Sequence, residues 1–145
     1  MAIETVEQAL EIVKEDGLEL EVVPEHLMTP EVCLEAIKQN GIALEFVPEE
    51  LITAELCWET IKQFGGDIDK VPENFRTPEL CLEAAKNSYD NANIRYIMGY
   101  VPKESLTAEL CQEAVRQDGT MLELVPQELK TPELCEAAAK AKKQS

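Results

Sequence analysis

A threonine that recurs at a nearly constant interval is the feature that most restricts how this chain can fold. It stands at Thr5, Thr29, Thr53, Thr77, Thr107 and Thr131, with steps of 24, 24, 24, 30 and 24 residues. A Val-Pro pair keeps the same spacing, with prolines at Pro24, Pro48, Pro72, Pro102 and Pro126. Self-similarity with a period of about 20–50 residues is typical of proteins that stack one supersecondary unit on the next. We therefore treat residues 1–145 as a single helical repeat domain, with units that begin at residues 5, 29, 53, 77 and 107 and a terminal half-unit over residues 131–145.

The unit that begins at Thr29 predicts one longer helix and one shorter helical piece. Thr29 is a good N-cap, and Pro30 suits the first helical turn because its missing N–H has no partner to lose. Gly41 is placed to be a left-handed C-cap, and the pair Val47-Pro48 prevents a continuous helix, so the second piece is short and partly 3-10. No such unit can bury its apolar side alone. We therefore expect an all-α fold, an α-solenoid of 24-residue repeats in which each repeat is a longer α-helix plus a short helical or 3-10 segment.

The longer helix carries a stripe of small apolar residues. In the unit that begins at Thr29, the stripe is Val32, Cys33, Ala36 and Ile37, which fall within an arc of about 140°. All five cysteines share one position of this stripe: Cys33, Cys57, Cys81, Cys111 and Cys135. Stacked helices lie about 8–10 Å apart, whereas a disulfide needs Cα atoms within about 4.4–6.8 Å. We therefore expect five reduced, buried cysteines that act through packing alone.

Charge and composition exclude several classes of protein. The formal net charge of −16 opposes binding to a nucleic-acid backbone, which requires clustered Lys and Arg. No run of 18 or more apolar residues is available for a membrane span, and the N-terminus lacks the blocks of a signal peptide. The sequence thus predicts a cytoplasmic protein with no nucleic-acid and no membrane partner.

The recurring motif TPELCLEAxKQxG, followed by LE-x-VPEEL, resembles a bacterial tandem-repeat family that is known only as a domain of unknown function. This resemblance covers nearly the whole chain. The 24-residue period of alternating long and short helical pieces is also similar in architecture to leucine-rich repeat variant proteins, whose arrays form right-handed superhelices. The resemblance implies a right-handed solenoid, and it implies no catalytic residue.

The fourth unit departs most from the pattern, because it has six extra residues and lacks the glycine. It holds all three tyrosines of the chain, and its candidate partner-binding residues are Tyr89, Asn91, Asn93, Arg95, Tyr96 and Tyr100. Insertions into one repeat often map to a binding face, and tyrosine is enriched in interfaces. In the alternative interpretation the insertion only lengthens the second helical piece, since Ile94, Ile97, Met98 and Val101 have helical spacing.

The sixth position of the unit is a second candidate surface. It is apolar in Leu10, Leu34, Trp58 and Leu82 and polar in the last two units, which predicts a half-exposed position. These side chains either pack between units or form a strip for a partner or a second copy. In the second case the candidate residues are Leu34, Trp58 and Leu82, with Trp58 as the anchor.

Acidic residues recur at the seventeenth position, as Glu21, Glu45, Asp69 and Glu123. They are either solvated or part of an acidic surface that attracts a basic partner. The single histidine, His26, has no nucleophile near it in the sequence, and the chain contains no Cys-x-x-Cys, no phosphate-binding loop and no calcium loop. We therefore predict no catalytic residue, no cofactor and no metal.

The function that fits these features best is a non-enzymatic protein–protein interaction module. Its partner is an unknown protein, possibly a basic one, and the chain itself is a monomer or a weak homodimer. Two alternatives stay open at this point: a structural or spacer array within a larger assembly, and an enzyme with an unrecognised pocket beside residues 89–100.

Overall fold

The computed structural model describes the backbone of residues 2–88 and 91–144 and the side chains of residues 2–88 and 94–141. Within these ranges the chain contains helices and turns but no strand. The α-helices are α1 (Val6–Glu15), α2 (Pro30–Gln39), α3 (Ala54–Gln63), α4 (Pro78–Lys86), α5 (Asn91–Met98), α6 (Ala108–Gln117) and α7 (Pro132–Gln144). Six-residue 3-10 helices follow four of them: η1 (Gly17–Val22), η3 (Gly41–Phe46), η5 (Gly65–Lys70) and η8 (Gly119–Leu124). The three-residue 3-10 helices are η2 (Glu25–Leu27), η4 (Glu49–Leu51), η6 (Glu73–Phe75), η7 (Lys103–Ser105) and η9 (Gln127–Leu129).

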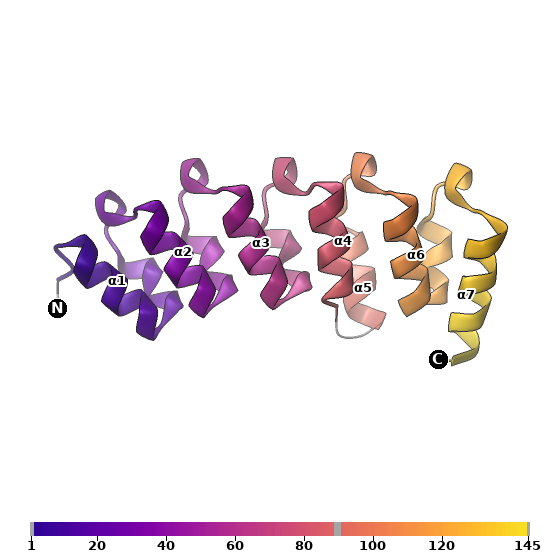
Figure 1. Ribbon diagram of the computed structural model, residues 1–145, viewed down its shortest axis with the longest axis horizontal. Coiled ribbons are helices and arrows are strands. Elements are labelled where there is room, and N and C mark those ends of the chain that lie inside the picture. Colours follow the sequence, from indigo (N-terminus) through magenta and orange to yellow (C-terminus); the bar gives the residue numbers. More distant parts are fainter. Residues whose placement is uncertain (1, 89–90, 145) are drawn as a thin grey trace.

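The longer helices lie side by side in one row, and the second segments form a row behind them (Figure 1). In the front row each of α1, α2, α3, α4, α6 and α7 contacts the next one. In the row of second segments η1 contacts η3, η3 contacts η5, and η5 contacts α5. The three-residue 3-10 helices lie along the upper edge in Figure 1. The molecule is therefore an elongated all-helical array of layers, where a layer is one longer helix together with the segments that follow it.

Each longer helix begins at the recurring threonine. At all six sites the threonine Oγ1 accepts a hydrogen bond from the backbone N–H three residues later, with distances of 3.1–3.2 Å. At Thr5 the side chain of Gln8 also accepts a bond from the Thr5 N–H, which completes a capping box. The helix starts predicted from the sequence are therefore confirmed.

The predicted left-handed C-cap at Gly41 and its equivalents is wrong. No glycine among the described residues has a positive φ. The helix α2 instead ends at Asn40, which is extended and whose side chain accepts a hydrogen bond from the Ile42 N–H at the start of η3. The glycine is needed for a close approach to the next layer, since a Cβ on Gly65 would lie only 2.1 Å from the carbonyl oxygen of Ala84.

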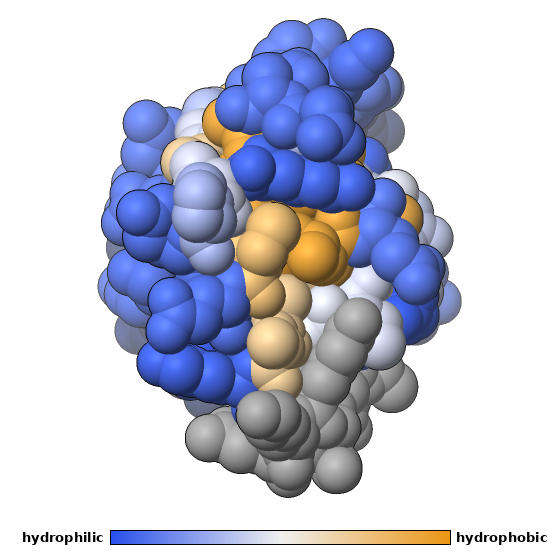
Figure 2. Space-filling view, turned by 90° about the vertical axis from the view of Figure 1, so that its right-hand side faces the viewer, coloured by the Kyte–Doolittle hydropathy of each residue, from blue (hydrophilic) through white to orange (hydrophobic). Residues whose placement is uncertain are grey.

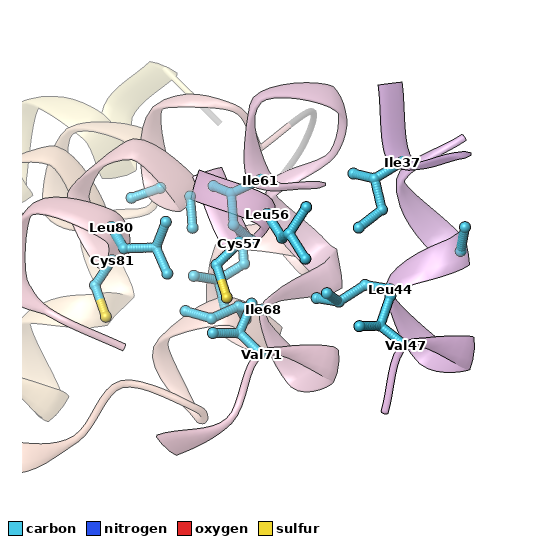
Figure 3. Packing of buried hydrophobic residues seen from close by; sticks show 14 of the residues in the cluster. Ile37, Leu44, Val47, Leu56, Cys57, Ile61, Ile68, Val71, Leu80 and Cys81 are labelled. Carbon is cyan, nitrogen blue, oxygen red and sulfur yellow. The ribbon is translucent and has the colours of Figure 1, made fainter. Parts of the chain in front are cut away.

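The apolar core runs without interruption between the two rows. The stripe predicted for α2 is fully buried. Figure 3 shows how three successive layers contribute: Ile37, Leu44 and Val47 from one, Leu56, Cys57, Ile61, Ile68 and Val71 from the next, and Leu80 and Cys81 from the third. Each layer thus shares its core with its neighbours, as expected for units that cannot bury their own apolar side.

The amide side chains near the ends of the longer helices link one layer to the layer before it. The Gln63 Oε1 accepts a hydrogen bond from the Gly41 N–H at 2.7 Å. The Asn87 Nδ2 donates to the carbonyl of Ile61 at 3.3 Å, and Gln117 makes the equivalent bond to α4. These bonds satisfy carbonyl groups at helix ends, which otherwise lack a partner inside the helix.

The two end helices reveal which positions face which neighbour. In α1, Ala9 and Val13 are fully buried although no helix precedes α1. Their equivalents in α7, Cys135 and Ala139, are exposed. These two positions therefore pack against the following layer. The described residues place no further layer beyond α7, and Figure 2, which faces this end, shows an apolar area surrounded by hydrophilic residues.

Four of the five cysteines are buried and free, as predicted: Cys33, Cys57, Cys81 and Cys111. Burial raises the pKa of Cys33, Cys57 and Cys81 to about 11, so these thiols stay protonated at neutral pH. The prediction is wrong for Cys135, which is exposed. Its place on the helix is the same, but the layer that buries the other cysteines does not follow it.

Candidate interaction surface

The insertion of the fourth layer forms an α-helix where other layers have a six-residue 3-10 helix. The helix α5 buries Ile94, Ile97 and Met98, and Val101 after it is partly buried against the core. These are the four residues whose spacing predicted a longer helical piece. The insertion therefore packs on the core like the other second segments, and its remaining side faces solvent.

The candidate residues of the insertion differ in exposure. Arg95 and Tyr96 are exposed, with 46% of the Tyr96 surface accessible. Tyr100 is half-buried and packs against the core. Tyr89 lies outside the described residues, as do the side chains of Asn91 and Asn93, whose backbone belongs to α5. The described part of this surface consequently consists of Arg95, Tyr96 and Tyr100.

The two tyrosines form a pair that is anchored to the preceding layer. Their ring centroids are 5.1 Å apart with the planes tilted by 55°, an arrangement that aromatic pairs favour. The Tyr96 hydroxyl donates a hydrogen bond to the Asp69 Oδ2 at 2.7 Å. This bond, and the nearby Tyr100 hydroxyl, raise the pKa of Tyr96 above its usual value. Asp69 in turn forms an ion pair with Lys70 at 3.6 Å.

Arg76 holds the other side of Tyr100. Its guanidinium lies 5.4 Å from the centre of the Tyr100 ring, within the range of a cation–π interaction. The Arg76 Nη1 donates to the Tyr100 carbonyl at 3.1 Å and its Nε donates to the Val71 carbonyl at 2.9 Å. Ser105 closes the arrangement, because its Oγ donates to the Arg76 carbonyl at 2.7 Å. Tyr100 is thus fixed by groups on both sides of α5.

Arg95 reaches forward to the fifth layer. Its Nη2 lies 3.7 Å from the Asp118 Oδ2 and donates a hydrogen bond to the Thr120 hydroxyl. The side chain remains about half exposed. The insertion therefore presents an aromatic pair whose neighbouring cation already has an acidic partner.

The second candidate surface lies in the other row. Leu34, Trp58 and Leu82 are half-buried and pack against the core, as does Leu10. The predicted half-exposed position is confirmed, and the contacts favour packing between layers over a free strip. A shallow hollow of about 250 Å³ lies beside Leu34, lined also by Pro30, Glu31, Leu51, Thr53, Glu55 and Leu56. Because these residues belong to α2–α4 and their surroundings, the structure does not bring them together with the tyrosine pair (Figure 1).

The sequence analysis missed a third set of exposed residues. Among the described residues, five large hydrophobic side chains are exposed, and all five lie in the row of second segments: Leu18 (37%), Val22 (59%), Ile42 (42%), Tyr96 (46%) and Leu124 (48%). The signal was a period of three, because a 3-10 helix has three residues per turn. In η1 the inward positions are Gly17 and Leu20, which leaves Leu18 and Glu21 on one outward line. A search with the α-helical period cannot find this pattern.

Acidic residues accompany these apolar ones. Glu21, Glu45 and Glu123 of the seventeenth position are exposed, and Asp69 is half-buried. A hollow of about 450 Å³ between the second and third layers is lined by Leu44, Glu45, Val47, Glu49, Ile52, Asp69 and Lys70. A larger hollow of about 760 Å³ at the edge of the array is lined by three carboxylates, Glu49, Glu73 and Glu104, together with Arg76 and uncharged residues. The exposed side of the second segments is therefore both apolar and acidic.

Residues 6–52 match a family model described as a domain of unknown function (DUF4116). The match extends from the start of α1 to the end of η4, which is the first two layers. It is consistent with the uncharacterised family that the motif resembles. A search of curated proteins and a search of solved structures found no match. The comparisons thus carry no evidence for an enzymatic activity.

Two further properties bear on the possible class of protein. No helix in the described part of the chain is long and apolar enough to cross a membrane. Within residues 2–88 and 91–144 no group of three or more His, Cys, Asp or Glu side chains is arranged to hold a metal ion. His26 is exposed, in line with its placement from the sequence.

Proposed function

We propose that this chain is a non-enzymatic protein–protein interaction module that binds a basic protein partner through its row of second segments. One observation carries the proposal: every large hydrophobic residue that is exposed in the described part of the chain belongs to that row. Exposed apolar side chains that gather on one side of a protein mark interaction sites. The acidic residues among them favour a positively charged partner.

The architecture that we propose is an α-solenoid of 24-residue units. The 24-residue spacing of the helix-capping threonines and the contacts of each layer with its neighbours support it. The right-handed sense of the superhelix and the likeness to leucine-rich repeat variant proteins stay predictions. Cytoplasmic localisation is also part of the proposal, supported by four buried free thiols that suit a reducing compartment.

The tyrosine pair is the part of the row that we expect to contribute most binding energy. Tyrosine offers a large contact area at a small cost in side-chain entropy. Tyr96 is held by Asp69, and Tyr100 is held by Arg76, so both rings are ordered before a partner arrives. Groups that are already ordered lose less freedom on binding, which raises affinity.

The test is a comparison of variants in partner capture. The 145-residue chain is immobilised and exposed to lysate of the source cell, and retained proteins are identified and then purified for affinity measurement. Tyr96→Ser removes half of the aromatic pair at an exposed position. A chimera in which residues 63–70 replace residues 87–100 removes the insertion and restores the 24-residue spacing. Trp58→Ala reports on the other candidate surface.

We expect a partner that binds wild type and Trp58→Ala but is lost in Tyr96→Ser and in the chimera, with binding that weakens as salt increases. Loss in Trp58→Ala alone, with all variants folded, would assign binding to the row of longer helices. Failure to retain any partner at low and high salt would contradict the interaction module and favour a structural spacer.

A further inference from the structure

We infer that the apolar and acidic pairs on η1 and η3 form a docking site for a positively charged amphipathic helix that lies across the first two layers. The inference rests on the proposed function, since it specifies the chemistry of a partner for the same row. It uses residues that are separate from the tyrosine pair, namely Leu18 and Glu21 on η1 and Ile42 and Glu45 on η3.

The four side chains form two equivalent pairs on adjacent elements. In a 3-10 helix, residues three apart are eclipsed, so Leu18 stands above Glu21 and Ile42 above Glu45. All four are exposed, with Leu18 at 37% and Ile42 at 42%. Because η1 and η3 contact each other and have the same length, the pairs repeat from one layer to the next.

The spacing of the pairs suits an α-helix. Packed helical layers are about 8–10 Å apart, and seven residues of an α-helix rise about 10.5 Å. A helix laid along the row can therefore place apolar residues seven positions apart on Leu18 and on Ile42. A basic residue one turn away from each apolar residue then reaches Glu21 or Glu45.

The charges decide the sign of the occupant. Neither η1 nor η3 contains a Lys or Arg. Further along the row the cations are already paired, Lys70 with Asp67 and Asp69, and Arg95 with Asp118. The first two layers are thus the part of the row whose carboxylates have no cation on the same element. The hollow of about 450 Å³ beside Glu45 gives a long basic side chain room to enter. An anionic lipid surface would be repelled by these carboxylates.

The experiment uses a designed probe and the whole 145-residue chain. The probe is a fluorescent synthetic peptide of about five helical turns with leucines seven residues apart, lysines one turn from each leucine, and alanines elsewhere. A scrambled peptide of the same composition is the control for charge alone. Binding is followed by fluorescence anisotropy at fixed ionic strength, and circular dichroism checks that every variant is folded.

Two double variants test the apolar and the acidic parts separately. Leu18→Ser with Ile42→Ser removes the apolar contacts, and Glu21→Lys with Glu45→Lys reverses the local charge. Glu31→Lys with Glu55→Lys is the matched control, because these exposed residues lie on α2 and α3 and the variant has the same net charge. We expect each test variant to bind the helical probe about tenfold more weakly, while the control loses less than about twofold.

Equal weakening by the matched control, or equal binding of the scrambled peptide, would mean that the probe responds to overall charge and would overturn the inference. Unchanged binding in the Leu18→Ser and Ile42→Ser variant would overturn it as well. Neither result affects the proposed function, which depends on loss of a cellular partner in Tyr96→Ser. Conversely, a peptide site on η1 and η3 can exist even if the tyrosine pair binds nothing.

Discussion

The segments η5 and α5 occupy equivalent places in successive layers and solve the same packing problem differently. In η5, six residues bury Ile68 and also a carboxylate, Asp67, which is only 6% exposed. In α5, the extra residues form a helix that buries Ile94, Ile97 and Met98. The two segments contact each other directly, so the array continues across the change.

The difference shows that the array constrains one side of a second segment and leaves the other side free. Both segments must present apolar groups to the longer helices, because an empty core position would leave a cavity. Their outer sides share no such requirement, and α5 carries Arg95 and Tyr96 there. The outer side of the insertion is therefore where a binding surface can be added at small cost to the fold.

The largest effect is expected from adding a methyl group at the glycine that begins η5. In Gly65→Ala the new Cβ would meet the Ala84 carbonyl oxygen at 2.1 Å, so the two layers must separate. We expect a loss of about 3 kcal/mol or more in the free energy of unfolding. Gly99→Ala, next to α5, is the control, because its nearest atom is the Tyr96 carbonyl oxygen at 3.3 Å. Urea denaturation of both variants measures the difference, and equal losses would show that the glycine of η5 is not a packing residue.

Thiol labelling compares how tightly the layers under the two segments are packed. Cys57 precedes η5 and Cys81 precedes α5, and burial raises both pKa values from 9.0 to about 11. Two pKa units lower the reactive thiolate about a hundredfold at mildly alkaline pH. We expect Cys57 and Cys81 to be labelled equally slowly and Cys135 to be labelled fast, as measured for each site by mass spectrometry. Faster labelling of Cys81 than of Cys57 would mean that the insertion loosens its layer.

The same thiols predict the direction of the pH dependence of stability. The folded state retains thiol protons that the unfolded chain releases above about pH 9, because the folded pKa values are raised. The free energy of unfolding should therefore fall as the pH rises from about 9 towards 11. Simultaneous replacement of Cys33 and Cys57 by Ala should reduce this slope.

Asp67 provides a smaller effect of opposite location on the pH scale. Burial raises its pKa from 3.8, while Lys70 at 3.6 Å acts to lower it. The folded state then holds a proton that the unfolded chain has lost, so the free energy of unfolding of the wild type falls as the pH rises from about 4 through the raised pKa. Asp67→Ala introduces the residue that η3 has at this position, Ala43. We expect this variant to gain about 1 kcal/mol relative to wild type between acidic and neutral pH, and a constant difference across that range would contradict the assignment.

The smallest effect is expected at the exposed ion pair of the insertion. In Arg95→Ala the contact with Asp118 at 3.7 Å is lost, but about half of the Arg95 side chain is exposed to water. Such pairs contribute about 0–1 kcal/mol, so thermal unfolding should change little. A clear loss of partner binding with unchanged stability would place Arg95 in the binding surface, and a large loss of stability would mean that the outer side of α5 is constrained after all.

The features that could be predicted from the sequence are those that depend on neighbours along the chain. The capping threonines such as Thr29, the buried stripe from Val32 to Ile37, and the helical spacing of Ile94, Ile97 and Met98 are all visible within one turn or two of helix. The position of the tyrosine insertion could also be predicted, because a change in period is a property of the sequence. The contacts of Tyr96 with Asp69 could not, since the two residues lie 27 positions apart and meet only when the layers stack.

By itself the sequence determined that this chain is built of helices with a 24-residue period, because caps, prolines and apolar spacing act locally. Only the tertiary structure decided what each recurring residue does. Gly65 is required because a carbonyl of the next layer approaches it, and Cys111 is buried while Cys135 is exposed because only Cys111 is covered by a following layer. The acidic and apolar lines on η1 and η3 likewise arise from a 3-10 turn whose inner side is chosen by the helices packed against it. Identical sequence positions thus acquire different environments, because burial depends on the neighbouring layer and not on the residue itself.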